Sequence, residues 1–203
     1  MTARRPVLVG LLGLLAAGCT EILPGQGPLP SLYTLTPKNS FSDNLPTVKV
    51  QLAIEEPIAS GGIDTQKIAL ANHPLETQYY ADARWTERAP QMVQTLMVES
   101  FENSHRIVAV GRQALSIRAD YELKTDLREF QAEYFDGAKV PTAHVRINAK
   151  LVRYPKREIV ASQTFEAKIP SASNDMLAIA AAFDEALGKV LRRLVEWTLT
   201  TVQ

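Results

Sequence analysis

Hydrophobic residues alternate with polar or small ones along several stretches of the chain, which is typical of β-strands with one buried face. Between Val48 and Ile54, every second residue is valine, leucine or isoleucine. Shorter stretches of strand-forming residues, most of them bounded by proline, glycine or asparagine, predict four more strands. These strands are expected at residues 32–35, 67–71, 76–81 and 106–110.

Three longer alternating patterns follow, at residues 121–130, 143–151 and 159–169. In the first pattern the alternation loses its phase near Phe130, which indicates a β-bulge. Asp136-Gly137 fits a turn after the first pattern, and Tyr154-Pro155-Lys156-Arg157 fits a hairpin turn after the second. We therefore expect these three segments to form long strands joined by turns.

Apolar residues spaced three and four positions apart predict two helices. The first helix ends near Asn103, and its start has two interpretations. Thr86 could cap a helix that begins at residue 87, or Pro90 could lie in the first turn of a helix that begins there.

The second helix is expected from about Asn174 to Thr200. Ser173 is the predicted N-cap, and Asp175 adds negative charge where the helix dipole favours it. Asp184, together with its neighbour Glu185, is expected on the solvent-exposed face. The patterns as a whole predict an α/β fold, in which a single mixed, mostly antiparallel β-sheet is packed by two long helices.

The N-terminal segment has the three parts of a secretory signal. Two arginines supply positive charge, residues 7–15 are apolar apart from two glycines, and three small residues come directly before Cys19, the only cysteine. This run resembles the lipobox of bacterial lipoproteins, although Ala16 stands where leucine is usual. We therefore expect cleavage before Cys19, followed by acylation of its thiol and its free amine.

Two other interpretations of this segment are weaker. A transmembrane helix needs about 20 apolar residues, which is more than the run provides. An ordinary signal peptide would leave a free thiol in an oxidising compartment. Because two or more acyl chains hold a protein stably on a membrane, an acylated Cys19 would be a lasting anchor.

The residue after the cysteine bears on which membrane receives the protein. In Gram-negative lipoproteins an aspartate at this position commonly marks retention in the inner membrane, and here the residue is Thr20. Thr20 thus implies the periplasmic face of the outer membrane. The predicted organisation is a lipoprotein signal peptide at 1–18, an acylated cysteine with a Pro/Gly tether at 19–30, and one folded domain at 31–203.

Charge and motifs exclude several classes of function. The chain has 22 basic and 22 acidic residues, and loss of two arginines with the signal would leave 20 basic against 22 acidic residues. A nucleic-acid-binding surface needs a basic excess, so no nucleic-acid partner is expected. No catalytic serine motif, phosphate-binding glycine loop or H-E-x-x-H motif is present. We therefore predict a protein that is not an enzyme and has no cofactor.

The three histidines do not share a spacing that suits a metal ion. His73, His105 and His144 lie far apart in the sequence. Each is expected on the surface or as a capping residue, and no metal site is predicted.

A pattern of spaced residues extends over nearly the whole predicted mature chain. Its members are Tyr33-Thr34-Leu35, Tyr79-Tyr80, Arg84-Trp85, the segment 127–130, and Phe183, Leu187 and Trp197. With the lipobox in front of it, this pattern resembles the ABC-type transport auxiliary lipoproteins, the PqiC-like family. The resemblance implies no catalytic residues. It implies partnership with an MCE-domain protein and an ABC permease/ATPase complex that move lipids between the two membranes, and several copies could share one partner as a homo-oligomer.

Arg84 and Trp85 are the candidate contacts with such a partner, because arginine and tryptophan are enriched in interface hot spots. A second interpretation places Trp85 in the core or at a hinge, since it stands beside the start of a predicted helix. Strand-edge pairing is the other candidate mode of contact.

Two functional classes remain open. The first is a non-catalytic adaptor held on the outer membrane by its acylated N-terminus. The alternative is a lipoprotein that binds a small apolar ligand, or an enzyme with an unrecognised site. An enclosed apolar pocket would favour the alternative, and an exposed patch or open sheet edge would favour the adaptor.

Overall fold

The computed structural model describes residues 29–112 and 118–202. The predicted signal peptide, Cys19, Thr20 and the tether up to residue 28 lie outside the described residues, so these predictions stay as they are. None of the helices in the described part of the chain is long and apolar enough to cross a membrane.

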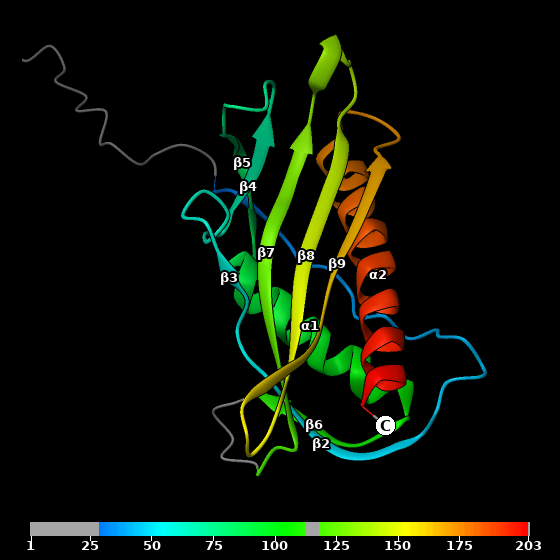
Figure 1. Cartoon of the computed structure of the whole chain (residues 1–203). Coiled ribbons are helices and arrows are strands. Elements are labelled where there is room, and N and C mark those ends of the chain that lie inside the picture. The colour runs from blue at the N-terminus through cyan, green and yellow to red at the C-terminus, as the bar shows by residue number, and fades with distance from the viewer. Residues whose placement is uncertain (1–28, 113–117, 203) are drawn as a thin grey trace, which may run out of the picture.

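The middle of the fold is a sheet of three long antiparallel strands (Figure 1). They are β7 (Tyr121–Glu133), β8 (Thr142–Arg153) and β9 (Glu158–Pro170). The predicted bulge is confirmed, because the pairing of β7 with β8 shifts between Leu127 and Glu129. Both predicted turns are present as well, and Asp136-Gly137 lies in a single 3-10 turn, η2 (Phe135–Gly137).

The other edge of β7 is shared by three short strands that follow one another along it, all parallel to it. They are β2 (Val48–Ile54), β3 (Ile58–Ala59) and β4 (Lys67–Ala71). Pro57 and the glycines at 61 and 62 interrupt this segment, which is why it accompanies β7 in steps rather than as one strand. The sequence did not predict β3, because two residues are too few to show an alternation.

The sheet extends further at both ends of this edge. β6 (Ile107–Arg112) pairs with β2, β5 (Gln78–Trp85) pairs with β4, and β1 (Ser31–Tyr33) pairs with β5. Among the described residues, five of the eight strand pairs are parallel and three are antiparallel. The expectation of a mostly antiparallel sheet is therefore wrong. Hydrophobic alternation shows which face of a strand is buried but carries no information about the direction of its neighbour.

Two helices cover one face of the sheet, as predicted (Figure 1). α1 (Ala89–Ser104) begins with proline in its first turn, so the second of the two predicted starts is confirmed. α2 (Met176–Thr201) is capped by Asp175, whose carboxylate accepts hydrogen bonds from the backbone N–H groups of Leu177 and Ala178. The predicted cap, Ser173, is wrong: its hydroxyl accepts from the N–H of Asp175, one step before the helix.

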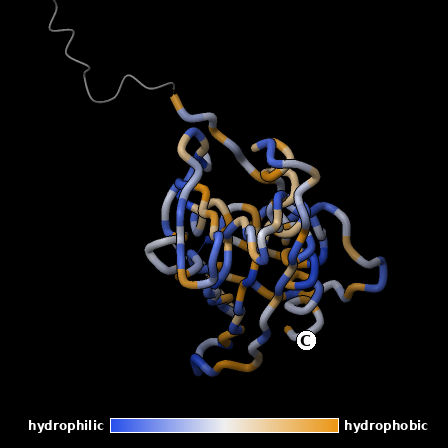
Figure 2. Tube along the Cα trace, turned by 90° about the horizontal axis from the view of Figure 1, so that it is seen from above, coloured by the Kyte–Doolittle hydropathy of each residue, from blue (hydrophilic) through white to orange (hydrophobic). Residues whose placement is uncertain are grey.

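An aromatic cluster joins the sheet to α2 at the centre of the core. Trp85 lies 5.5 Å from Phe130 and 5.3 Å from Phe183, and the last two are 5.2 Å apart between ring centroids. All three side chains are at most 1% exposed. Such contacts add to the free energy that burial of the rings already provides. Apolar positions gather between the sheet and the helices in the view along the sheet, while polar positions dominate the outside (Figure 2).

We expect Phe183→Ala to lower the free energy of unfolding by about 3–5 kcal/mol, because it leaves a cavity between β5, β7 and α2. Urea unfolding of acyl-free protein from Leu29 onward measures this loss. Ile159→Ala is the matched control, since Ile159 is 62% exposed and its truncation creates no cavity. An equal loss in both variants would contradict the central place of the cluster.

Candidate functional site

Arg84 and Trp85 are neighbours in β5, so their side chains leave the strand on opposite faces. Trp85 points into the aromatic cluster and is 1% exposed. This is the core position that the second interpretation of the sequence expected. A partner contact through the indole would require the core to open, and it stays an untested prediction.

Arg84 is half-buried and holds an irregular part of its own strand. From Lys67 opposite Arg84 to Ala69 opposite Tyr79, β4 advances two residues while β5 advances five. The extra residues of β5 bulge away from β4, which withdraws their carbonyl groups from the ladder. The guanidinium Nη1 donates to the carbonyl oxygens of Tyr80, Ala81 and Ala83, at 2.8, 3.1 and 2.7 Å. Arg84 thus stabilises the bulge while part of its surface remains accessible.

A shallow hollow of about 740 Å³ lies beside Arg84. Its walls come from the start of the described chain, from the segment before β4 and from the start of α1, and they include Leu32 and Lys67. Leu32 is 65% exposed. Arg88 also lines the hollow and forms ion pairs with Asp64 and, at 3.3 Å, with Glu56. The hollow therefore presents an exposed apolar side chain surrounded by charged groups, a combination that suits a protein contact.

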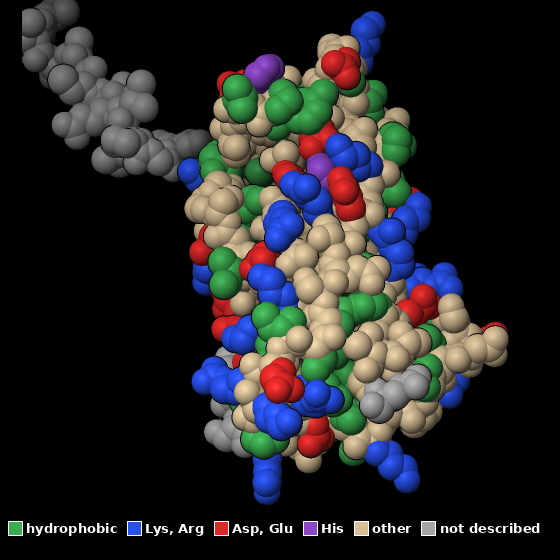
Figure 3. Space-filling view, in the orientation of Figure 1, with side chains coloured by type: hydrophobic (Ala, Val, Ile, Leu, Met, Phe, Trp, Pro, Cys, Tyr) green, Lys and Arg blue, Asp and Glu red, His purple; other side chains and the backbone are tan. Residues whose placement is uncertain are grey.

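A network of charged side chains covers the face of β7, β8 and β9 that is turned away from the helices (Figure 3). His144 lies at its centre and is only 5% exposed. Its Nδ1 is 2.6 Å from Glu133 Oε1, and its Nε2 is 2.7 Å from Glu166 Oε1. The expectation that His144 is a surface or capping residue is wrong. β8 lies between two strands, and the long side chains of these neighbours cover the imidazole.

Both ring nitrogens of His144 face carboxylate oxygens. Two cationic side chains complete the network: Arg146 pairs with Glu129, and the Nζ of Lys168 lies 3.0 Å from Glu133. Burial alone would raise the pKa of Glu133, but hydrogen bonds from His144 and Lys168 outweigh burial and hold that pKa below its usual range.

Potential metal ligands are part of the same network. Ligand atoms of Glu129, Glu133 and His144 lie within 4.8 Å of one another, the one such group among residues 29–112 and 118–202. Arg146 and Lys168 already neutralise the two carboxylates. A cation would have to displace both of them, so the arrangement is a closed ion network rather than an open metal centre.

The other two histidines cap local structure, as expected. His73 Nδ1 accepts from the N–H of Leu75 at 3.2 Å, and His105 ends α1 in the left-handed conformation with φ of 52°. Asp184, in contrast, does more than face solvent. Its carboxylate accepts from the N–H of Thr36 at 2.6 Å and from the hydroxyl of the same residue at 3.0 Å, which fastens the segment after β1 to α2.

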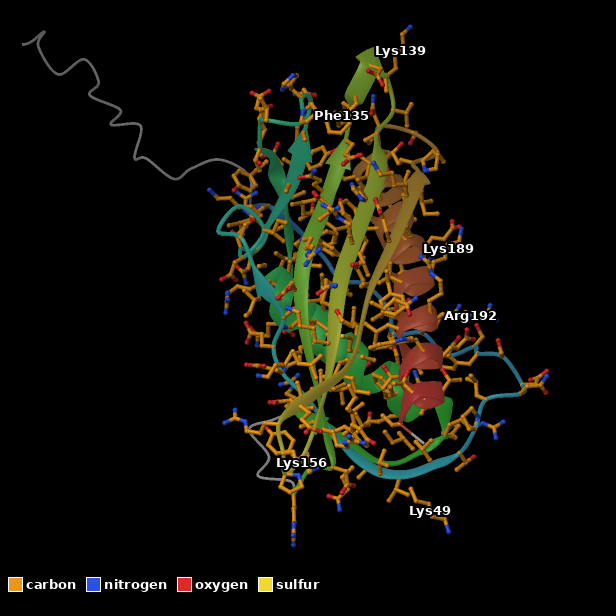
Figure 4. All side chains as sticks on the ribbon, in the orientation of Figure 1. Lys49, Phe135, Lys139, Lys156, Lys189 and Arg192 are labelled. Carbon is orange, nitrogen blue, oxygen red and sulfur yellow. The ribbon has the colours of Figure 1, made fainter. Side chains whose placement is uncertain are left out.

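A groove of about 710 Å³ lies between this fastened segment and α2. Lys38, Asp184, Lys189 and Arg192 line it, and the last two are labelled on the outer side of α2 in Figure 4. The groove is open to solvent and lined by charged side chains. It lacks the enclosed apolar walls of a small-molecule site.

Within the described residues, β1, β3, β6 and β9 each pair with one strand only and so keep an unpaired outer edge. The edges of β6 and β9 differ in how far other groups cover them. Arg193 from α2 donates to the carbonyl of Glu166 and so occupies part of the β9 edge. On β6, Val108 is 68% exposed. The β6 edge is thus the more accessible of the two for pairing with another chain.

The sequence and the fold have relatives. A family model described as ABC-type transport auxiliary lipoprotein component matches residues 33–195. The uncharacterized protein bll6063 of Bradyrhizobium diazoefficiens is 28% identical over 195 residues, which are 95% of this chain and 52% of that protein. The chain therefore spans about half the length of this relative.

Solved structures share the architecture. Protein XCC0632 from Xanthomonas campestris, a DUF330 family protein, is 38% identical with a TM-score of 0.80, over 84% of this chain and 95% of that one. The crystal structure of an uncharacterized protein has a TM-score of 0.67 at 12% identity, over 84% of this chain and 99% of that one. The second likeness concerns the fold alone.

We expect Glu133→Gln to lower the free energy of unfolding at pH 7 by about 1–3 kcal/mol, because His144 and Lys168 lose their ionised partner. Since the folded-state pKa of Glu133 is lowered, its stabilising effect is present above the unfolded pKa and is lost as pH falls through the folded value. The difference in free energy of unfolding between the unchanged protein and Glu133→Gln should therefore disappear below about pH 4.

Urea unfolding of the unchanged protein and of Glu133→Gln between pH 3 and pH 8 measures this effect. Glu185→Gln provides the matched control, because Glu185 pairs with Lys189 on the exposed side of α2. A gap of unchanged size down to pH 3 would show that the effect of Glu133 does not come from its charge.

Proposed function

Because the chain belongs to the ABC-type transport auxiliary lipoprotein family, we propose that it is a non-catalytic component of an MCE/ABC-type system that moves lipids between the two membranes of a Gram-negative bacterium. The observation that supports this most directly is the extent of the family match. Residues 33–195 include every strand from β2 to β9, α1 and most of α2. The family match thus extends over nearly the whole described fold rather than over one motif.

In this proposal Cys19 anchors the protein and Thr20 directs it to the outer membrane. The lipobox-like run before Cys19 supports the first step, and the absence of aspartate at position 20 supports the second. Acyl chains confine the protein to a surface, which raises its local concentration and favours even a weak contact with a partner. Several anchored copies could share one partner.

The proposed partner is the periplasmic part of an MCE-domain protein bound to an ABC permease and ATPase. A tether of about 12 residues reaches about 40 Å at full extension. This length cannot bridge the space between the membranes, so the partner must supply the remaining distance. The lipoprotein then ties the far end of the transporter to the outer membrane.

The hollow beside Arg84 is the contact surface that best fits this partner. It combines the exposed Leu32 with the accessible part of Arg84, and it lies on the strand pair formed by β1 and β5. Apolar centres with charged surroundings are typical of protein interfaces. Trp85 supports the surface from below by filling the core under the end of β5.

We expect Cys19→Ser to prevent acylation and to leave the precursor uncleaved at this site, because the thioether cannot form. Mass spectrometry of the mature N-terminus measures both effects. An unmodified Cys19, or a mature chain that starts at another residue, would contradict the anchor.

Thr20→Asp is the matched variant for this prediction, since it keeps the acylated cysteine and changes only the sorting position. Membrane fractionation should find the unchanged protein in the outer membrane and Thr20→Asp in the inner membrane. Equal distribution of the two proteins would show that residue 20 does not direct sorting.

We expect Leu32→Asp to reduce recovery of the transporter about tenfold in a pull-down from solubilised membranes, because a central apolar contact would be replaced by a charge. Arg84→Ala should act in the same direction. Ile159→Asp, on an exposed apolar residue of β9, should leave recovery unchanged. Circular dichroism of each variant verifies that the fold is intact.

Recovery of MCE or ABC components that is unaffected by both hollow variants would move the contact to another surface. Recovery of no such component, by the unchanged lipoprotein and after crosslinking, would contradict the proposed function. That result would favour the ligand-binding alternative.

A further inference from the structure

Three connecting segments meet at one end of the sheet. They are the turn 72–77 between β4 and β5, the loop 134–141 between β7 and β8, and the segment 171–175 before α2. The pairings of Ala71 with Glu133, Glu133 with Thr142 and Thr142 with Pro170 place their starting points side by side. We name this part of the molecule the loop end.

Hydrogen bonds join the loop 134–141 to the segment 171–175 and to β5, the strand that follows the turn 72–77. The hydroxyls of Tyr80 and Tyr134 are 3.0 Å apart, and the Tyr134 hydroxyl donates to Asn174 Oδ1 at 3.2 Å. Asn174 Nδ2 in turn donates to the carbonyl of Lys139. Two of the three segments are therefore held to each other, and β5 links them to the strand pair that carries the third.

The loop end presents large apolar side chains to solvent. Leu75 is 91% exposed, Leu177 in the first turn of α2 is 70% exposed, and Val140 is 36% exposed. Hydrophobic side chains gather at the upper end of the face drawn in Figure 3, and Figure 4 places Phe135 and the outward-pointing Lys139 there. Leu75 and Val140 come from two of the three segments, and Leu177 comes from the start of α2, directly after the third.

The direction of β1 indicates what covers this surface. β1 runs parallel to β5, with Ser31 opposite Ala83 and Tyr33 opposite Trp85. β5 starts at the loop end, at Gln78, and runs away from it. Residues before Ser31 therefore leave the sheet toward the loop end. Leu29, the first described residue, is 93% exposed.

The distances suit a membrane on that side. The register position of Ser31 lies five residues from Gln78, which is about 17 Å of strand. Ten Cα-to-Cα steps lead from Cys19 to Leu29, and they reach at most about 35 Å. A membrane that holds the acyl chains of Cys19 is thus within reach of the loop end, whereas the opposite end of the sheet points away from it.

We infer that the loop end rests on the lipid surface to which the N-terminus is anchored, with Leu75, Val140 and Leu177 inserted between the lipid headgroups. This inference rests on the proposed acyl anchor and adds a second, weaker membrane contact to it. Apolar side chains gain free energy when they leave water for the headgroup region. Charge does not add to this contact, because Lys139 is opposed by Glu76, Asp136 and Asp175 in the same three segments. The contact fixes the orientation of the domain and turns the hollow beside Arg84 toward the periplasm.

The test places one environment-sensitive fluorophore on the acylated full-length protein in vesicles of phosphatidylethanolamine and phosphatidylglycerol. Leu75→Cys, Val140→Cys and Leu177→Cys provide the attachment sites, because the thiol of Cys19 is blocked by its acyl chain. Ile159→Cys is the matched control: it is also exposed and apolar, but it lies at the start of β9, at the opposite end of the sheet. Lipids that carry a quencher in their headgroup region report contact.

Quenching and a blue-shifted emission at positions 75, 140 and 177, with neither at 159, are the expected results. Leu75→Asp combined with Leu177→Asp should reduce the quenching at position 140 several-fold, whereas Ile159→Asp should leave it unchanged. Equal quenching at all four positions would overturn the inference. So would shielding of position 75 only in membranes that contain the transporter, which would assign the loop end to a protein partner.

Flotation of the same vesicles separates failure of this inference from failure of the anchor. Protein that floats with the vesicles but shows no quenching at the loop end keeps its anchor and contradicts the second contact. Protein that does not float contradicts the anchor itself, and with it the inference.

Discussion

β7 needs hydrogen-bond partners along both of its edges, because it is a strand of thirteen residues whose middle is buried. β8 satisfies one edge over its whole length. The other edge is satisfied in three steps by β2, β3 and β4, which come from a segment divided by proline and glycine. The rest of the fold depends on this arrangement. It sets where β6 and β5 extend the sheet, and through β5 it sets the direction in which the N-terminus leaves the domain.

The two faces of the long strands are closed by different interactions. On one face, Trp85, Phe130 and Phe183 join the sheet to α2. On the other face, the carboxylates of Glu129, Glu133 and Glu166 contact Arg146, Lys168 and the two ring nitrogens of His144. Because both faces are satisfied within the described chain, they leave little for a ligand to bind. The surfaces that remain available lie at the ends and edges of the sheet.

The available surfaces are separated along β5. The loop end lies where β5 begins, and the hollow beside Arg84 lies where it ends. An anchored domain that rests its loop end on the membrane would hold the hollow away from the lipid, in a position to meet a partner. Arg84 thus stabilises the bulge of β5 at the same place where the proposed contact with the partner forms. One side chain can serve both, because its guanidinium is only half-buried.

Residue patterns along the chain were enough to predict most elements. Strands 48–54 and 67–71 have the bounds that the alternation indicated, and both helices and the bulge in β7 are present. These features depend on neighbours in the sequence, where periodicity is visible. The tertiary structure alone decided three features. They are the parallel direction of five strand pairs, the burial of His144, and the hydrogen bonds from Arg84 to carbonyl groups of β5. The first two depend on which distant strand lies alongside, and the third depends on the irregular pairing of β5 with β4. An alternating pattern records that a face is buried but not what lies against it.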